Sequence, residues 1–209
     1  MEKQQVFYIH GGDSISEYPI FLEYLKSLDI TDLPWAEEKP KRWNHKFRED
    51  LGGEFEVFTP QMPNKLNAQY TEWKIWFEKH FEYIHDDVVL VGYSLGGLFL
   101  AKYLVENDTP FNIKALFFVA AVYGDGSLVD EDGDDGGDFL YDVSLVPTIA
   151  DKVGSITLLH SKDDFVVPYE HALKYKAALP EAELVTFEDK NHFLVEELPE
   201  LVERIKALR

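Results

Sequence analysis

The sequence predicts an α/β fold, a three-layer α/β/α sandwich in which a mostly parallel six-stranded sheet lies between two layers of helices. Short apolar runs of strand length alternate with longer stretches whose apolar residues recur every three or four positions. Several of these runs end in glycine or in polar residues, as in sheets whose carboxyl ends form a ligand-binding crevice. Strands are expected near residues 5–10, 55–59, 87–92, 114–120, 155–160 and 183–188.

Helices are expected between these strands. Aromatic and aliphatic residues recur every three or four positions over residues 70–84, which predicts an amphipathic helix that packs its aromatic face on the sheet. Similar apolar stripes occur at residues 98–105, 171–179 and 198–208. No internal repeat or linker divides the chain, so we expect one domain over residues 1–209.

Two segments are longer than a single crossover between strands requires, and we interpret both as insertions. Residues 14–53 are expected to hold a helix at 18–28, a proline-bearing stretch at 34–40 and a short helix at 42–51. Residues 124–142 contain no basic side chain and eight acidic ones, which are Asp125, Asp130, Glu131, Asp132, Asp134, Asp135, Asp138 and Asp142.

The acidic segment has two interpretations. Asp130, Asp132 and Asp134 have the spacing of a calcium-binding loop. However, Gly136 takes the seventh position of such a loop instead of the sixth, and Tyr141 takes the twelfth, where a bidentate glutamate is needed. We therefore favour a mobile, solvated loop near the mouth of the crevice that acts as a small lid.

Composition favours a compact enzyme. The 209 residues include no cysteine, which excludes disulfides, thiolate catalysis and zinc-thiolate sites. Twenty basic and 39 acidic residues give a net charge of −19, which repels nucleic acids and acidic membranes. This charge serves either solubility or a preference for neutral or cationic substrates. Residues 1–5 are polar and precede only a short apolar run, so we expect no signal peptide, no membrane association and a cytoplasmic location.

The strongest local signal is the pentapeptide Gly92-Tyr93-Ser94-Leu95-Gly96, which lies between an apolar strand and a helical stretch. A chain that passes from a buried strand into a helix through such a tight turn places the turn residue in a strained conformation and exposes its side chain. The first free amides of the following helix then lie near whatever the serine attacks. Ser94 is therefore the candidate nucleophile.

A serine nucleophile needs a base and a group that orients the base, and both residue types follow in the sequence. The expected strand at 155–160 leads into a loop that contains Asp163 and Asp164, and the strand at 183–188 leads into a turn that contains His192. The carboxyl ends of parallel strands converge on one crevice. Ser94 and His192 are therefore expected to meet there with one of the two aspartates.

With these residues the chain resembles the α/β-hydrolase superfamily, and within it the small serine hydrolases related to retinoblastoma-binding protein 9 and YdeN. The resemblance covers residues 6–208. It rests on four short motifs, which are His10-Gly11-Gly12, the serine turn, the Asp-Asp-Phe-Val-Val-Pro loop at 163–168 and Asn191-His192-Phe193.

The resemblance implies further details. The superfamily acid precedes the loop proline by four residues, which selects Asp164 rather than Asp163. The oxyanion amides map to Gly12 and Leu95. The implied strand order is 2-1-3-4-5-6, and the antiparallel hairpin that larger members carry before these strands is missing here.

We therefore expect a serine hydrolase that cleaves a carboxylic ester or a similar small acyl compound through an acyl-enzyme on Ser94, without a cofactor. The alternative is a hydrolase-like fold that binds a protein partner with little turnover, since fold does not fix function. His45, His80 and His85 lack the spacing of metal ligands, so no metal site is expected. His10 is expected to hydrogen-bond the oxyanion loop. Nothing in the sequence indicates a homo-oligomer.

Overall fold

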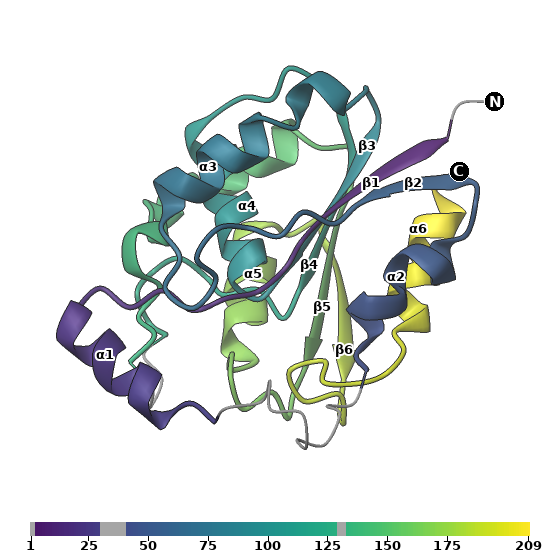
Figure 1. Ribbon diagram of the computed structural model, residues 1–209. Helices are drawn as coiled ribbons and strands as arrows, with labels where there is room; N and C mark the ends of the chain where they lie inside the picture. The colour runs from purple at the N-terminus through teal and green to yellow at the C-terminus, as the bar shows by residue number, and fades with distance from the viewer. Residues whose placement is uncertain (1–2, 30–40, 129–132) are drawn as a thin grey trace.

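A six-stranded parallel sheet forms the centre of the computed structural model, which describes residues 3–29, 41–128 and 133–209 (Figure 1). The strand order is β2-β1-β3-β4-β5-β6, as predicted, and every strand pair in the described residues is parallel. Each strand end lies within one residue of its predicted position. The strands are β1 (Gln4–Ile9), β2 (Phe55–Phe58), β3 (Val88–Tyr93), β4 (Ile113–Val119), β5 (Ile156–Ser161) and β6 (Glu183–Phe187).

Helices cover both faces of the sheet, which confirms the predicted α/β sandwich (Figure 1). One face packs against α3 (Tyr70–Glu78), α4 (Leu95–Glu106) and α5 (Glu170–Ala178). The other face packs against α2 (Trp43–Leu51) and α6 (Pro199–Ala207), which lie side by side. No helix in the described part of the chain is long and apolar enough to cross a membrane.

The central strands explain why the sequence signal was clear. Every residue of β3 is buried, because helices cover this strand on both faces, so its sequence is continuously apolar rather than alternating. The edge strand β6 has no fully buried residue. The stripe at 70–84 forms two elements instead of one helix, since α3 ends at Glu78 and a short 3₁₀ turn, η1 (Phe81–Tyr83), follows.

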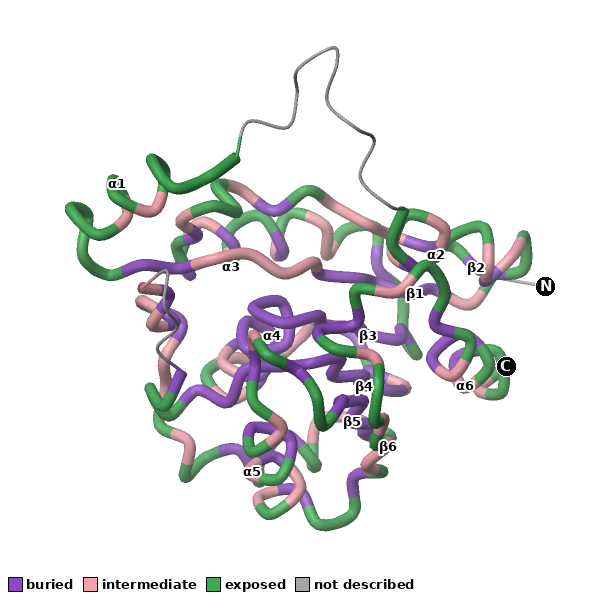
Figure 2. Tube along the Cα trace, turned by 90° about the horizontal axis from the view of Figure 1, so that it is seen from below, coloured by how far each residue is buried: buried purple, intermediate pink, exposed green. Residues whose placement is uncertain are grey.

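Helix α1 (Tyr18–Ser27) forms where the first insertion predicted it, but it buries none of its residues. It stands away from the body of the protein as an exposed segment (Figure 2). The expected short helix near residues 42–51 is α2. The proline-bearing stretch at 34–40 lies outside the described residues.

The acidic segment is anchored where the structure describes it. Asp134 is buried, and its carboxylate accepts hydrogen bonds from the backbone N–H groups of Ser14 and Gly136. Asp135 accepts from Ser16, and Asp138 accepts from the backbone N–H of Tyr70. The expectation of a solvated loop is therefore wrong for the buried Asp134, and Asp135 and Asp138 are hydrogen-bonded to distant parts of the chain. Asp130 and Asp132 of the calcium-like spacing lie outside the described residues.

Candidate active site

Ser94 occupies a sharp turn between β3 and α4. Its backbone has φ 53° and ψ −120°, a conformation that side-chain-bearing residues rarely adopt and that costs energy. The backbone N–H of Ser94 donates a 2.9 Å hydrogen bond to the carbonyl of Val119 at the end of β4. The turn is therefore held by the sheet itself, and the serine has the geometry expected of a nucleophile elbow.

Three glycines make this turn possible. A Cβ atom on Gly96 would lie 2.3 Å from the carbonyl oxygen of Ile9, and one on Gly92 would lie 2.7 Å from the Cα of Gly97. A Cβ on Gly97 would lie 2.4 Å from that of Ala121. The start of α4 therefore packs directly against the carboxyl ends of its neighbours, which leaves no room for side chains.

Asp164 and His192 form a buried pair. The Nδ1 atom of His192 lies 2.9 Å from Oδ2 and 3.1 Å from Oδ1 of Asp164. The backbone N–H groups of Val166 and Val167 donate 2.9 Å hydrogen bonds to the same carboxylate. These bonds fix the orientation of the carboxylate, which in turn fixes the imidazole ring with Nε2 free.

Asp163, the other candidate acid, points elsewhere. Its Oδ1 accepts hydrogen bonds from the hydroxyl of Ser161 and from the backbone N–H of Asn191. The Ser161 hydroxyl lowers the pKa of Asp163. Asp163 therefore holds the loop before His192 in place, whereas Asp164 contacts the ring itself.

The loop that carries His192 is strained and tightly anchored. Asn191 and Phe193, on either side of the histidine, have φ values of 48° and 51°. Phe193 is fully buried and packs edge-on against Phe187, with ring centroids 5.4 Å apart. The Tyr93 hydroxyl donates a 2.7 Å hydrogen bond to the His192 carbonyl. Sequence reasoning missed this role of Tyr93, because no spacing rule connects residues 99 positions apart.

Ser94 and His192 line one cavity of about 570 Å³ at the carboxyl ends of the strands. No hydrogen bond joins their side chains in the described residues, a looseness that is common in serine hydrolases before substrate binds. Val122, Val166 and Val167 contribute apolar surface to the cavity. Its volume is typical of small-molecule sites.

The two expected oxyanion donors are placed differently with respect to this serine. Gly12 lines the cavity, and Leu95 is the first residue of α4. Neither backbone N–H donates a hydrogen bond to any described residue. The turn before Gly12 is fixed by His10, whose Nε2 accepts from the backbone N–H of Met62, so that Nδ1 carries the proton and donates to the carbonyl of Gly11. Burial lowers the pKa of His10, which favours this neutral form.

Polar residues that the sequence did not single out line the other wall of the cavity. Arg42 and His45 come from the start of α2, and Lys65 comes from the loop after β2. Tyr8, at the end of β1, also contributes. No motif marks these residues, because their meeting depends on where two loops fold.

The remaining buried histidines do not reach the cavity. His160 Nε2 donates to the carbonyl of Val167, and His171 Nδ1 accepts from the backbone N–H of Tyr123. Burial lowers the pKa of both rings. In the described residues, no group of three or more histidine or carboxylate side chains has the arrangement of a metal site.

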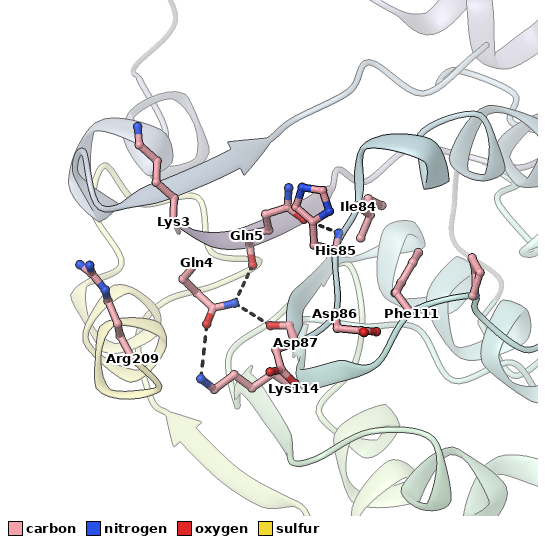
Figure 3. A pocket seen from close by; sticks show the side chains of 11 residues that line it. Lys3, Gln4, Gln5, Ile84, His85, Asp86, Asp87, Phe111, Lys114 and Arg209 are labelled. Atoms are coloured by element: carbon pink, nitrogen blue, oxygen red, sulfur yellow. Dashed lines mark hydrogen bonds between the residues drawn. The ribbon is translucent and has the colours of Figure 1, made fainter. Parts of the chain in front are cut away.

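A larger cavity, of about 680 Å³, lies at the opposite ends of the strands (Figure 3). Lys3, Gln4, Lys114 and Arg209 line it, and the Gln4 side chain connects the carbonyl of Asp87 to the ammonium of Lys114. No serine is among its lining residues, and the predicted site residues Ser94 and His192 line the other cavity.

Comparison with known proteins agrees with this geometry. A family model described as serine hydrolase matches residues 33–206, which is most of the chain. No curated protein gives a significant match.

Solved structures share the fold. The YdeN gene product of B. subtilis has a TM-score of 0.67 at 17% sequence identity, over 99% of this chain and 98% of that one. A putative YdeN-like hydrolase from Pectobacterium atrosepticum has a TM-score of 0.61 at 12% identity, over 99% and 91%. Est1E from Butyrivibrio proteoclasticus, solved with ferulic acid bound, has a TM-score of 0.57 at 18% identity, over 99% and 88%. The predicted likeness to YdeN-like α/β hydrolases is therefore confirmed.

Proposed function

The chain belongs to the serine hydrolase family, and on this basis we propose that it cleaves a carboxylic ester or a similar acyl compound through an acyl-enzyme on Ser94. One observation carries the proposal. Ser94, in its strained turn, lines the same cavity as His192, whose ring is hydrogen-bonded to the buried Asp164.

In the first step, His192 Nε2 takes the proton of the Ser94 hydroxyl as Oγ attacks the carbonyl carbon of the substrate. Asp164 accepts from Nδ1–H, which keeps Nε2 unprotonated beforehand and stabilises the imidazolium that forms. For this step the side chains of Ser94 and His192 must come into hydrogen-bond contact, which the described structure does not show.

The negative charge that develops on the carbonyl oxygen is stabilised by backbone N–H groups of Gly12 and Leu95. Two features support this role. Neither amide donates to an acceptor within the described part of the chain, and Leu95 lies at the positive end of the α4 dipole. His192 then donates its proton to the leaving alkoxide, and the ester C–O bond breaks.

Water completes the cycle. His192 removes a proton from water, the hydroxide adds to the acyl carbon, and Ser94 leaves with the proton returned to its oxygen. The products are a carboxylic acid and an alcohol. No residue of this scheme requires a metal ion or an organic cofactor.

A fluorophosphonate probe tests the proposal directly, because it reacts only with an activated serine. Wild-type protein should carry the label on the peptide that contains Ser94, and Ser94→Ala should carry none. p-Nitrophenyl esters of increasing acyl length then measure substrate size, and the cavity of about 570 Å³ favours short and medium acyl groups. A folded wild-type protein that neither takes the label nor hydrolyses any ester would instead support the protein-binding alternative.

A further inference from the structure

Two cationic side chains line the cavity of Ser94 in a strongly acidic protein. Arg42 and Lys65 both line it, although the chain has 39 acidic residues and only 20 basic ones. If the charged residues of a cavity were drawn at random from this sequence, about two in three would be acidic. Asp13 and Asp134 also line the cavity, so its charged lining holds as many cations as carboxylates, unlike the protein as a whole.

Neither cation is neutralised within the described structure. The guanidinium of Arg42 and the ammonium of Lys65 form no ion pair with any carboxylate in residues 3–29, 41–128 or 133–209. Elsewhere basic side chains do pair, as Lys174 does with Asp125 at 2.6 Å. Among the described residues, no carboxylate pairs with the positive charge that Arg42 and Lys65 place at the cavity.

The start of α2 strengthens this positive field. Arg42 is the N-cap residue of this nine-residue helix, His45 follows in its first turn, and the first turn contains no acidic residue. A helix N-terminus is the positive end of the backbone dipole, where carboxylates stabilise and cations destabilise. The positive end of the α2 dipole therefore adds to the field of the Arg42 guanidinium.

Both cations lie close to the reacting groups. Burial raises the pKa of the Tyr8 and Tyr93 hydroxyls, and the nearby charge of Arg42 partly opposes this rise. Tyr93 directly precedes Ser94. The carbonyl of Lys65 accepts a 2.9 Å hydrogen bond from the backbone N–H of Asp13, so the Lys65 loop adjoins the candidate oxyanion turn. Arg42 and Lys65 therefore line the same cavity as Ser94, where an anionic group of a bound acyl substrate can reach them.

The carboxylates that line the same cavity are already engaged within the fold. Asp134 is buried and accepts from two backbone N–H groups. Asp13 accepts a 2.8 Å hydrogen bond from the hydroxyl of Tyr24. Their hydrogen-bonding capacity is partly used by the protein, whereas the cationic groups remain open to a ligand.

From these observations we infer that Arg42 and Lys65 bind a carboxylate or phosphate group carried by the acyl substrate, so that the enzyme prefers anionic esters to neutral esters of the same shape. This inference rests on the proposed function and names the substrate class of the same site. It differs from one of the two readings of the net charge, the preference for neutral or cationic substrates; the other reading, solubility, is unaffected.

Mono-4-nitrophenyl glutarate and 4-nitrophenyl pentanoate test the inference, because their acyl chains are nearly equal in length and only the first ends in a carboxylate. Wild-type protein should show a kcat/KM about tenfold higher for the glutarate ester, as expected for one charge-assisted hydrogen bond. Arg42→Gln and Lys65→Gln should each reduce this ratio several-fold, and the ratio should fall with added sodium chloride.

Lys3→Gln is the matched control. It changes the net charge by the same amount but lies at the opposite cavity (Figure 3), so the ratio of the two esters should not change. Inhibition of pentanoate ester hydrolysis by glutarate and by inorganic phosphate distinguishes the two kinds of anion. A lower inhibition constant for glutarate identifies a carboxylate site, and a lower one for phosphate identifies a phosphate site.

A binding measurement separates this inference from the proposed function. Titration calorimetry on the Ser94→Ala protein needs no turnover, and the glutarate ester should bind about tenfold more tightly than the pentanoate ester. That difference should decrease in Ser94→Ala, Arg42→Gln protein. Equal affinities and equal kcat/KM values would overturn the inference while leaving the serine hydrolase proposal intact. Preferential binding of the glutarate ester without labelling of wild-type Ser94 would support the anion site and contradict the serine hydrolase proposal.

Discussion

The hydroxyl of Tyr93 donates a 2.7 Å hydrogen bond to the backbone carbonyl of His192, so the residue next to the candidate nucleophile holds the loop of the candidate base. The two rings also lie in contact, with centroids 5.1 Å apart. Because the loop has left-handed residues on both sides of His192, it needs such anchors to keep its conformation.

Tyr93→Phe should therefore disturb the position of the His192 loop more than it weakens substrate binding. The change leaves a buried carbonyl without its donor, which costs about 1–3 kcal/mol. We expect kcat to fall about tenfold with little change in KM, and the urea midpoint to fall as well. Tyr169→Phe is the control, because its hydroxyl bonds Thr186 at an exposed position and its loss should change neither quantity measurably. Equal kinetic effects of both changes would contradict a special role for Tyr93.

The two adjacent aspartates should differ sharply in steady-state assays. Asp164→Asn should reduce kcat by about 10⁴-fold, because the amide favours the wrong tautomer of His192. Asp163→Asn should have a much smaller effect, since its contacts are to Ser161 and to the backbone of Asn191. A larger loss from Asp163→Asn would reverse the assignment.

Local sequence patterns predicted the strands and the serine turn well, since both depend on residues that are neighbours in the chain. The apolar run of β3 and the glycines beside Ser94 mark the turn within one short stretch of sequence, although contacts with Ile9 and Val119 hold it in the fold. The residues alone could not choose between Asp163 and Asp164. Both follow the same strand, and only the turn that starts at Ser161 decides which carboxylate meets His192.

The acidic segment at residues 124–142, in contrast, could not be predicted from neighbouring residues. Its carboxylates were expected to stay solvated because no basic residue lies nearby in the sequence. In the structure, backbone N–H groups of Ser14, Ser16 and Tyr70 serve as their donors. These partners are more than 60 residues away, so no sequence pattern reveals them. Arg42 and Lys65 were missed for the same reason, since two separate loops bring them to the cavity.

The packing of the serine turn predicts a steric effect on stability. Gly96→Ala places a Cβ where the carbonyl of Ile9 lies, so the start of α4 must move away from β1. We expect a loss of about 1–3 kcal/mol in the free energy of unfolding, together with a loss of Ser94 labelling. Gly53→Ala is the control, because a Cβ there meets nothing within 4 Å and the expected change is small. Similar urea midpoints for the two variants would contradict the close packing.

His171 should make stability depend on pH. Burial lowers its pKa to about 4, whereas an unfolded histidine titrates near 6.5. Between these values the unfolded chain binds more protons, so the free energy of unfolding falls as the pH decreases from about 7 to about 4. His171→Asn keeps an acceptor for the backbone N–H of Tyr123 but cannot titrate. Urea unfolding at pH 7 and pH 5 should show wild-type protein losing about 2 kcal/mol more than the variant. If wild-type protein and His171→Asn lose the same free energy of unfolding between pH 7 and pH 5, the lowered pKa of His171 is contradicted.

The most direct test of the central claim is to trap the acyl-enzyme. Wild-type protein mixed with excess p-nitrophenyl acetate and quenched in acid within the first turnovers should gain the mass of one acetyl group, and peptide mapping should place that group on Ser94. His192→Ala should accumulate little of this species, because proton removal from Ser94 is lost. Release of p-nitrophenol by wild-type protein with no acetyl group on Ser94, or undiminished release by Ser94→Ala, would contradict the account.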